Sequence, residues 1–151
     1  MAEAQIPEGL TADYANELVQ DALAALQTEP DYERLAAFLT SLREGYLVAD
    51  VTGTHKKKST NVRTIRSTKG QLVLPLFTSM DELRLAHPKG SKDQAKGAIM
   101  PALEALRLIE TSPFVAVQFN TGSAALPVLR KYIARVLGGL PIEAGQLETK
   151  G

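Results

Sequence analysis

Apolar residues recur along the chain with two different periods, and the period predicts which segments are helices and which are strands. Near the N-terminus the spacing is three to four residues. This predicts an amphipathic helix whose N-cap is Thr11 and whose apolar stripe runs from Tyr14 to Leu26. A second stripe of the same period begins after Pro30 and is ended by Gly45, which suits a left-handed helix cap. The chain is therefore expected to open with two helices.

The next part of the chain carries longer apolar runs, which are typical of buried strands. Strands are predicted at 46–51, 62–68 and 71–77. A polar loop and a tight turn connect them, so a three-stranded antiparallel meander is expected. Pro75 lies inside the third strand and has no N–H for a ladder hydrogen bond. The middle of that strand must therefore face an edge or contain a bulge.

An abrupt change from apolar to polar residues after this strand predicts the start of a short helix. Ser79 and Glu82 have the spacing of a capping box, in which each side chain accepts a hydrogen bond from the other residue's amide. Asp81 and Glu82 also lie at the positive end of the helix dipole. Capping therefore explains Ser79 without a role as a nucleophile.

The second half of the chain predicts a strand-helix-strand unit and a last helix. The unit consists of a possible strand at 98–100, a helix with Pro101 in its first turn, and an apolar strand at 114–119. The pattern leaves open whether residues 98–100 join the sheet. The last helix is predicted to begin at Pro127, and residues 138–151 are predicted to form a flexible C-terminal tail.

Together these elements predict one α/β (α+β) domain. Its mixed sheet would have about five strands, packed with about five helices. Residues 1–27 would form the acidic amphipathic helix of the domain and residues 28–137 its core. The chain has 151 residues, of which 44% are hydrophobic and 23% charged. A domain of this size buries roughly 70% of the surface of its unfolded chain, so it needs no disulfide or metal for stability.

The composition excludes several kinds of chemistry. The chain has no cysteine, which rules out disulfides, thiolate metal sites and cysteine nucleophiles. Its two histidines, His55 and His87, fall in predicted loops, so we expect His87 at the surface and no metal site. No signal peptide is recognisable at the N-terminus, and no apolar run approaches the roughly 20 residues needed to span a bilayer. We therefore expect a cytoplasmic protein without a cofactor or membrane contact.

A formal net charge of zero hides a change of sign along the chain. Residues 1–50 hold 10 acidic and 2 basic residues, and residues 51–100 hold 3 acidic and 10 basic ones. The last part, 101–151, is nearly balanced, with 4 acidic and 5 basic residues. Such an asymmetry indicates that an acidic segment contacts a basic surface, in the same chain or in a neighbouring one.

Three segments carry a resemblance to a known family. They are "YLVADV" at 46–51, "LPLFTS" at 74–79 followed by Glu82-Leu83, and "VAVQFNTGS" at 115–123. Over about 31–137 the chain resembles the SseB N-terminal domain family of the enhanced-serine-sensitivity type. The resemblance implies a bacterial protein with an α/β fold and without established catalytic residues. The chain departs from the family at its second corner, where the family often has an Asp-Pro-Ala-Gly turn.

The strongest cluster of one charge lies in residues 55–70, "HKKKSTNVRTIRSTKG", which contain no acid. Its six bases are Lys56, Lys57, Lys58, Arg63, Arg66 and Lys69. They suit contact with an acidic protein surface, contact with nucleic acid phosphates, or a solvated hairpin without a partner. Arg63 and Arg66 would point to opposite faces of a regular strand, and no aromatic residue is interleaved to stack on bases. Nucleic acid is therefore the least favoured partner.

The corner Asn120-Thr121-Gly122-Ser123 is a weaker candidate site. Backbone amides at a point where a strand ends and a helix begins can hold an anion. The same four residue types also suit any ordinary turn, and the glycine and lysine spacing of a P-loop is missing. Both interpretations stay open, with the plain turn favoured.

The sequence favours a non-enzymatic protein-interaction or regulatory domain. The basic hairpin at 55–70 and the loop at 87–97 would contact a protein partner, and the acidic first helix would pack on that surface or reach a second copy. No Gly-x-Ser-x-Gly elbow is present, and the adjacent Asp81 and Glu82 do not form a convergent catalytic pair. The alternative is a small-anion or nucleotide sensor at Asn120 to Ser123, and RNA binding through the lysines is a minor alternative.

Overall fold

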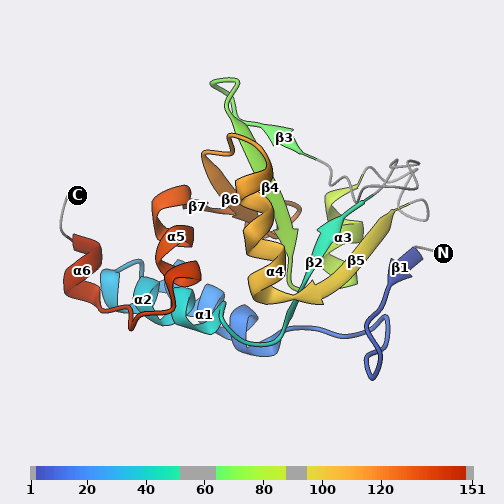
Figure 1. Ribbon diagram of the computed structural model, residues 1–151, viewed down its shortest axis with the longest axis horizontal. Coiled ribbons are helices and arrows are strands. Elements are labelled where there is room, and N and C mark those ends of the chain that lie inside the picture. Colours follow the sequence, from blue (N-terminus) through green and yellow to red (C-terminus); the bar gives the residue numbers. More distant parts are fainter. Residues whose placement is uncertain (1–2, 52–63, 88–94, 149–151) are drawn as a thin grey trace.

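A mixed β-sheet organises the residues that the computed structural model describes, which are 3–51, 64–87 and 95–148 (Figure 1). The strands are β1 (Glu3–Gln5), β2 (Tyr46–Asp50), β3 (Ile65–Arg66), β4 (Leu72–Phe77), β5 (Lys96–Pro101), β6 (Ala116–Phe119) and β7 (Leu126–Leu129). The helices are α1 (Glu17–Thr28), α2 (Tyr32–Ser41), α3 (Met80–Ala86), α4 (Ala102–Arg107), α5 (Arg130–Gly138) and α6 (Ala144–Glu148), and a 3-10 helix (Leu108–Thr111) follows α4.

The strand order is β1-β5-β2-β4-β6-β7, with β3 paired to the start of β4. The pairs β1/β5 and β4/β6 are parallel and the others antiparallel. The predicted α+β class with a mixed sheet is therefore confirmed, although the described residues contain seven strands. Residues 98–100 do join the sheet, because β5 pairs with β2 from Gly97 to Pro101. The crossover from β5 through α4 to β6 passes β2 and β4.

The predicted antiparallel meander is wrong in one respect, because β3 does not lie between β2 and β4 in the sheet. Both strands pair with the same edge of β4, β3 at Leu72 and Val73, and β2 at Leu76 and Phe77. The carbonyls of Leu72 and Leu76 accept hydrogen bonds from the β6 side. By alternation Pro75 presents its backbone to the opposite edge, between the two partner strands, where no N–H is needed.

The two faces of the sheet are covered differently (Figure 1). On one face, residues of β2, β4, β6 and β7 form a large apolar cluster with α1, α2, α4, α5 and α6. On the other face, a smaller cluster joins β2, β4 and β5 to α3, with Leu10 and Tyr14 at its margin. Gly97 lets α3 approach this face closely, since a Cβ there would lie 2.5 Å from Met80 Sδ and 2.8 Å from Leu83 Cδ2.

The first helix begins later than predicted. Its N-cap is Asn16, whose Oδ1 accepts from Val19 N at 3.1 Å, and Thr11 lies outside the helix. Ala15 forms a β-bridge with Ser79, and Asn16 N donates to Thr78 O at 2.9 Å. These contacts with the end of β4 hold the preceding backbone extended, so the helix cannot start before them. Sequence spacing alone does not record such long-range pairing.

The C-terminal part also differs from the prediction. Pro127 lies in β7 opposite Gln118, and the last long helix starts only at Arg130. An edge strand tolerates proline, because one side of its backbone has no partner. Within the segment predicted as a flexible tail, α6 packs against α2 and Leu147 is buried. Five helical residues are too few to give a visible period in the sequence.

The described helices include none that is both long enough and apolar enough to cross a membrane.

Candidate functional site

A small cavity opens where Pro75 interrupts the pairing of β2 with β4. The ladder between these strands stops at Ala49 and Leu76. The next pair would place Asp50 opposite Pro75, which has no N–H to donate. The cavity at this break has a volume of about 80 Å³. Its lining consists of Asp50, Ile65, Pro75, Phe77, Ala86, His87 and Thr121.

Two buried side chains that hydrogen-bond to each other, Asp50 and His87, form the polar wall of the cavity. Asp50 Oδ2 lies 2.9 Å from His87 Nε2, and the two side chains are only 7% and 5% exposed. Burial of either group without a partner would be costly, so the contact ties the end of α3 to the end of β2. The prediction that His87 lies at the surface is therefore wrong. An acid that ends an apolar strand, as Asp50 does, was the available signal for a buried partner.

The corner after β6 joins the ends of two parallel strands through Asn120. Asn120 is buried and has a positive φ of 52°. Its Oδ1 accepts from Thr78 N at 3.0 Å, and its Nδ2 donates to Thr78 Oγ1 at 3.1 Å. Gln20 Nε2 of α1 donates to the same hydroxyl at 2.9 Å. Asn120 is therefore already engaged in holding β4, β6 and α1 together.

The rest of this corner packs on α3. A Cβ on Gly122 would lie 2.6 Å from the carbonyl atoms of Leu85, and Ser123 Oγ donates to Glu82 Oε1 at 2.6 Å. The amides of Ser123 and Ala125 both donate to Asn120 O. The corner leads into β7 and not into a helix, so the helix-dipole part of the predicted anion site is wrong.

The predicted capping box at the start of α3 is half present. Ser79 Oγ accepts from Glu82 N at 3.2 Å, as expected. The carboxylate of Glu82, however, accepts from Ser123 of the neighbouring corner. Glu82 thus links α3 to the corner after β6, a role that no local sequence pattern could indicate.

Six bases of residues 55–70 are the predicted binding residues. Of these, Arg66 and Lys69 are described, whereas Lys56, Lys57, Lys58 and Arg63 lie outside the described residues. Arg66 Nη1 donates to Gly70 O across the turn at 2.8 Å, and Lys69 is exposed at the tip. This hairpin projects from the molecule at the end opposite to α1 (Figure 1).

The acidic first helix does not pack on the described part of the hairpin. It packs on α2 instead and contributes to the large apolar cluster. The ion pairs of the lysines and arginines in the described ranges are local ones, between Arg34 and Glu29 or Asp31 and between Arg84 and Asp81. Among these ion pairs, none joins α1 to Arg66 or Lys69.

Two basic segments of the sequence connect to the described residues around the cavity. Residues 52–63 leave from Val51, and residues 88–94 leave from His87. Val51 N donates to Lys96 O at 2.9 Å, beside the point where 88–94 rejoins the sheet. Ile65, just after 52–63, lines the same cavity as Asp50 and His87. The attachment points of both segments are therefore neighbours at one end of the sheet.

The cavity at this end of the sheet is small. A cavity of about 80 Å³ is well below the roughly 300–1,000 Å³ usual for ligand pockets. Within residues 3–51, 64–87 and 95–148, no group of three or more His, Asp or Glu side chains could hold a metal ion. What the geometry does provide is a rigid base for two positively charged segments.

Comparison with known proteins gives one result. The family model described as the SseB protein N-terminal domain matches residues 19–135, which is most of the chain. Neither a curated protein nor a solved structure matches it. The matched region includes the cavity, the Asn120 corner and both basic segments.

Proposed function

We propose a binding role, not a catalytic one, for this chain, which belongs to the SseB protein N-terminal domain family. In this proposal it is a cytoplasmic regulatory domain that recognises an acidic protein surface through its basic segments. The observation that carries the proposal is the gathering of the attachment points of 52–63 and 88–94 around the Asp50–His87 pair. Together these two segments hold six bases, Lys56, Lys57, Lys58, Arg63, Lys89 and Lys92, and one acid, Asp93.

The position of α1 supports a contact between molecules. Helix α1, which contains Glu17 and Asp21, lies at the end of the molecule opposite to the turn that carries Arg66 and Lys69 (Figure 1). Exposed charges separated by more than the Debye length, about 8 Å at physiological salt, are largely screened from each other. A complementary surface on another protein, or on a second copy, is therefore the natural ligand.

A protein partner is favoured over nucleic acid. Residues 55–70 contain no aromatic side chain on which a base could stack. Acidic protein surfaces need only charge complementarity, which also speeds association. The alternative of an anion sensor at Asn120 to Ser123 has less support, because the amides of Ser123 and Ala125 already donate to Asn120 O.

The test is affinity purification from native lysate, with and without nuclease. The variant reverses three charges at once, with Lys56, Lys57 and Lys58 each changed to Glu. Arg107→Glu, at an exposed base of α4, controls for a general loss of positive charge. We expect a partner that resists nuclease and is captured by wild type and by Arg107→Glu but lost with the triple change. Recovery of nucleic acid alone, or capture unaffected by the triple change, would refute the proposal.

A further inference from the structure

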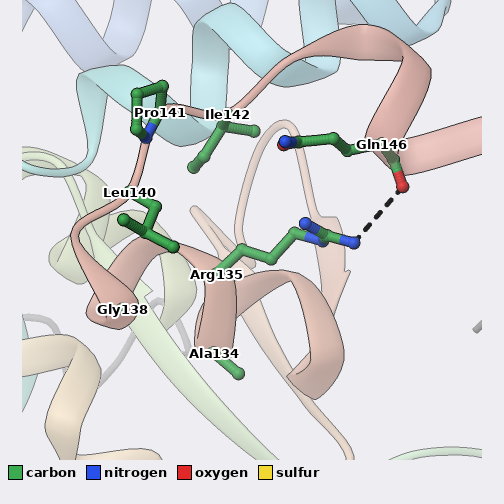
Figure 2. A pocket seen from close by; sticks show the side chains of 7 residues that line it. All are labelled: Ala134, Arg135, Gly138, Leu140, Pro141, Ile142 and Gln146. Atoms are coloured by element: carbon green, nitrogen blue, oxygen red, sulfur yellow. Dashed lines mark hydrogen bonds between the residues drawn. The ribbon is translucent and has the colours of Figure 1, made fainter.

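A second recessed surface lies far from the cavity, between α5, α6 and the segment that connects them. This cleft has a volume of about 310 Å³. Figure 2 shows Ala134 and Arg135 of α5 on one side, Leu140 to Ile142 on another, and Gln146 of α6 across from Arg135. Its wall is largely apolar, and Leu140 is 75% exposed. Its volume lies at the lower limit of the roughly 300–1,000 Å³ that is usual for ligand pockets.

The walls of the cleft are held in place by polar contacts to the backbone. The guanidinium of Arg43, just after α2, donates to the carbonyls of Arg135, Val136 and Leu140 at 2.9, 3.1 and 2.5 Å. Arg135 Nη2 donates to Gln146 O at 3.3 Å (Figure 2). The cleft is therefore preformed, so that a ligand would not have to order it on binding.

One base, Arg135 of α5, lines the cleft, and Glu143 lies in the segment between Ile142 and Gln146. Helix α5 contains Arg130, Lys131 and Arg135 and no acidic residue. Lys131 precedes Arg135 by four residues, which places both on the same side of the helix. A suitable occupant thus combines one apolar side chain with carboxylates beside it.

The chain itself has a segment of that chemistry in α1. This helix contains Glu17 and Asp21 and no base. Leu18, between them, is 52% exposed, whereas the buried side chains of α1 are Val19, Leu23 and Leu26. Leu18 and Asp21 are three residues apart and hence neighbours on the helix surface. The result is an exposed leucine flanked by carboxylates.

We infer that α1 of one copy docks in the α5–α6 cleft of a second copy, with Leu18 in the hollow and Asp21 facing Arg135. Each copy carries both surfaces, so a two-fold arrangement makes the contact twice and closes the dimer. This inference depends on the proposed function in one respect, namely that α1 takes part in contacts between molecules. It adds that the surface contacted by α1 is the α5–α6 cleft of a second copy.

The experiment measures self-association of the full chain by sedimentation velocity over a wide range of concentration. Leu18→Arg and Arg135→Glu should each weaken dimerisation at least about tenfold, since a central apolar anchor and its charge partner dominate such contacts. The matched controls are Leu85→Arg, at a leucine that is 51% exposed on α3, and Arg107→Glu on α4. Both should leave dimerisation unchanged.

Two further measurements test the pairing itself. Asp21→Arg combined with Arg135→Glu restores opposite charges with their signs exchanged, and should recover most of the lost affinity. An equimolar mixture of Leu18→Arg and Arg135→Glu chains should associate more tightly than either variant alone, because one of the two contacts is then intact. Circular dichroism and thermal unfolding of each variant establish that the fold is retained.

A wild-type chain that stays monomeric at every concentration would overturn the inference. So would a dimer that ignores Leu18→Arg and Arg135→Glu, or one that the controls weaken equally. The triple change at Lys56, Lys57 and Lys58 should leave self-association unaltered, and Leu18→Arg should leave capture of the acidic partner unaltered. The failure of one proposal is thereby distinguishable from the failure of the other.

Discussion

The two faces of the sheet are stabilised by different kinds of contact. The face under α1, α2, α4, α5 and α6 buries large apolar side chains, among them Phe38 and Leu106, which have no exposed surface. The face under α3 has a smaller apolar cluster. It adds the Asp50–His87 pair and the close approach of Gly122 to Leu85.

This difference has consequences for mutation. Apolar burial has no preferred direction, so cores of that kind accept many volume-conserving changes. A buried hydrogen bond between side chains and a close contact with backbone atoms each depend on one geometry. We therefore expect the helical face to lose stability in proportion to the volume removed. The α3 face should respond to small changes that remove no apolar volume at all.

The largest effect is expected for Phe38→Ala on the helical face. The Phe38 ring packs edge-on against Phe119, with centroids 5.3 Å apart and planes at 89°. Loss of a fully buried phenylalanine lowers the free energy of unfolding by about 4 kcal/mol. Phe38→Leu should cost less than half as much, because it leaves a smaller cavity. Urea unfolding measures both, and equal losses would show that volume is not the determinant.

The next largest effect is expected at the buried pair on the α3 face. Asp50→Ala leaves His87 without this partner, and removal of one member of such a pair costs about 3 kcal/mol. His87→Ala should cost a similar amount. The double variant should lose clearly less than the two single losses together, because each single change already breaks the same contact. Strictly additive losses in this double-mutant cycle would mean that the contact does not stabilise the fold.

Gly122→Ala adds only one methyl group and still should destabilise the α3 face. The new Cβ would meet the backbone of Leu85 at 2.6 Å, and backbone atoms cannot rotate away. Overpacking of this kind costs about 2 kcal/mol. Gly145→Ala in α6 is the matched control, since a Cβ there has no atom within 4 Å. Thermal unfolding should show a lower Tm for the first variant and an unchanged or higher Tm for the second.

The same contrast explains how much of the fold the sequence predicts. Strands β2 and β4 were predicted nearly to the residue, because their apolar patterns reflect burial within one element. Helix α2 was also predicted, but it ends at Ser41, and its C-cap is Leu42 and not the predicted Gly45. The start of α1 and the identity of β7 were missed. Both depend on pairing with distant strands, with β4 at Ser79 and with β6 at Gln118.

The candidate site was harder to predict than the fold. The sequence shows the clusters of lysine and arginine, and it predicts that the strand around Pro75 faces an edge or contains a bulge. The structure shows instead that Pro75 faces the gap between β2 and β3. The sequence does not show that His87 meets Asp50, because the two are separated by 37 positions. Nor does it show that Glu82 accepts a hydrogen bond from Ser123. Polar contacts between distant residues leave no period in a sequence, so they appear only when the chain is folded.

The smallest effect is expected from Asp31, an exposed charge that caps α2 on the helical face. Hydrogen bonding from the Arg34 amide, at 2.8 Å, and the charge of Arg34 hold the pKa of the Asp31 carboxyl below its ordinary value of 3.8. A lowered carboxyl pKa means that the unfolded chain binds the proton more readily. The ionised Asp31 carboxylate therefore stabilises the folded state fully above about pH 5. This stabilisation is lost as the pH falls below about 4 and through the folded-state pKa.

Asp31→Asn keeps the capping geometry and removes the charge. Its Tm should differ slightly from that of wild type at pH 7 and approach it as the pH falls and wild-type Asp31 becomes protonated. Asp50→Asn provides the contrast, because its carboxylate is buried and its loss should be several times larger at pH 7. If the two variants lose the same stability at neutral pH, burial of the carboxylate would not be what distinguishes Asp50 from Asp31.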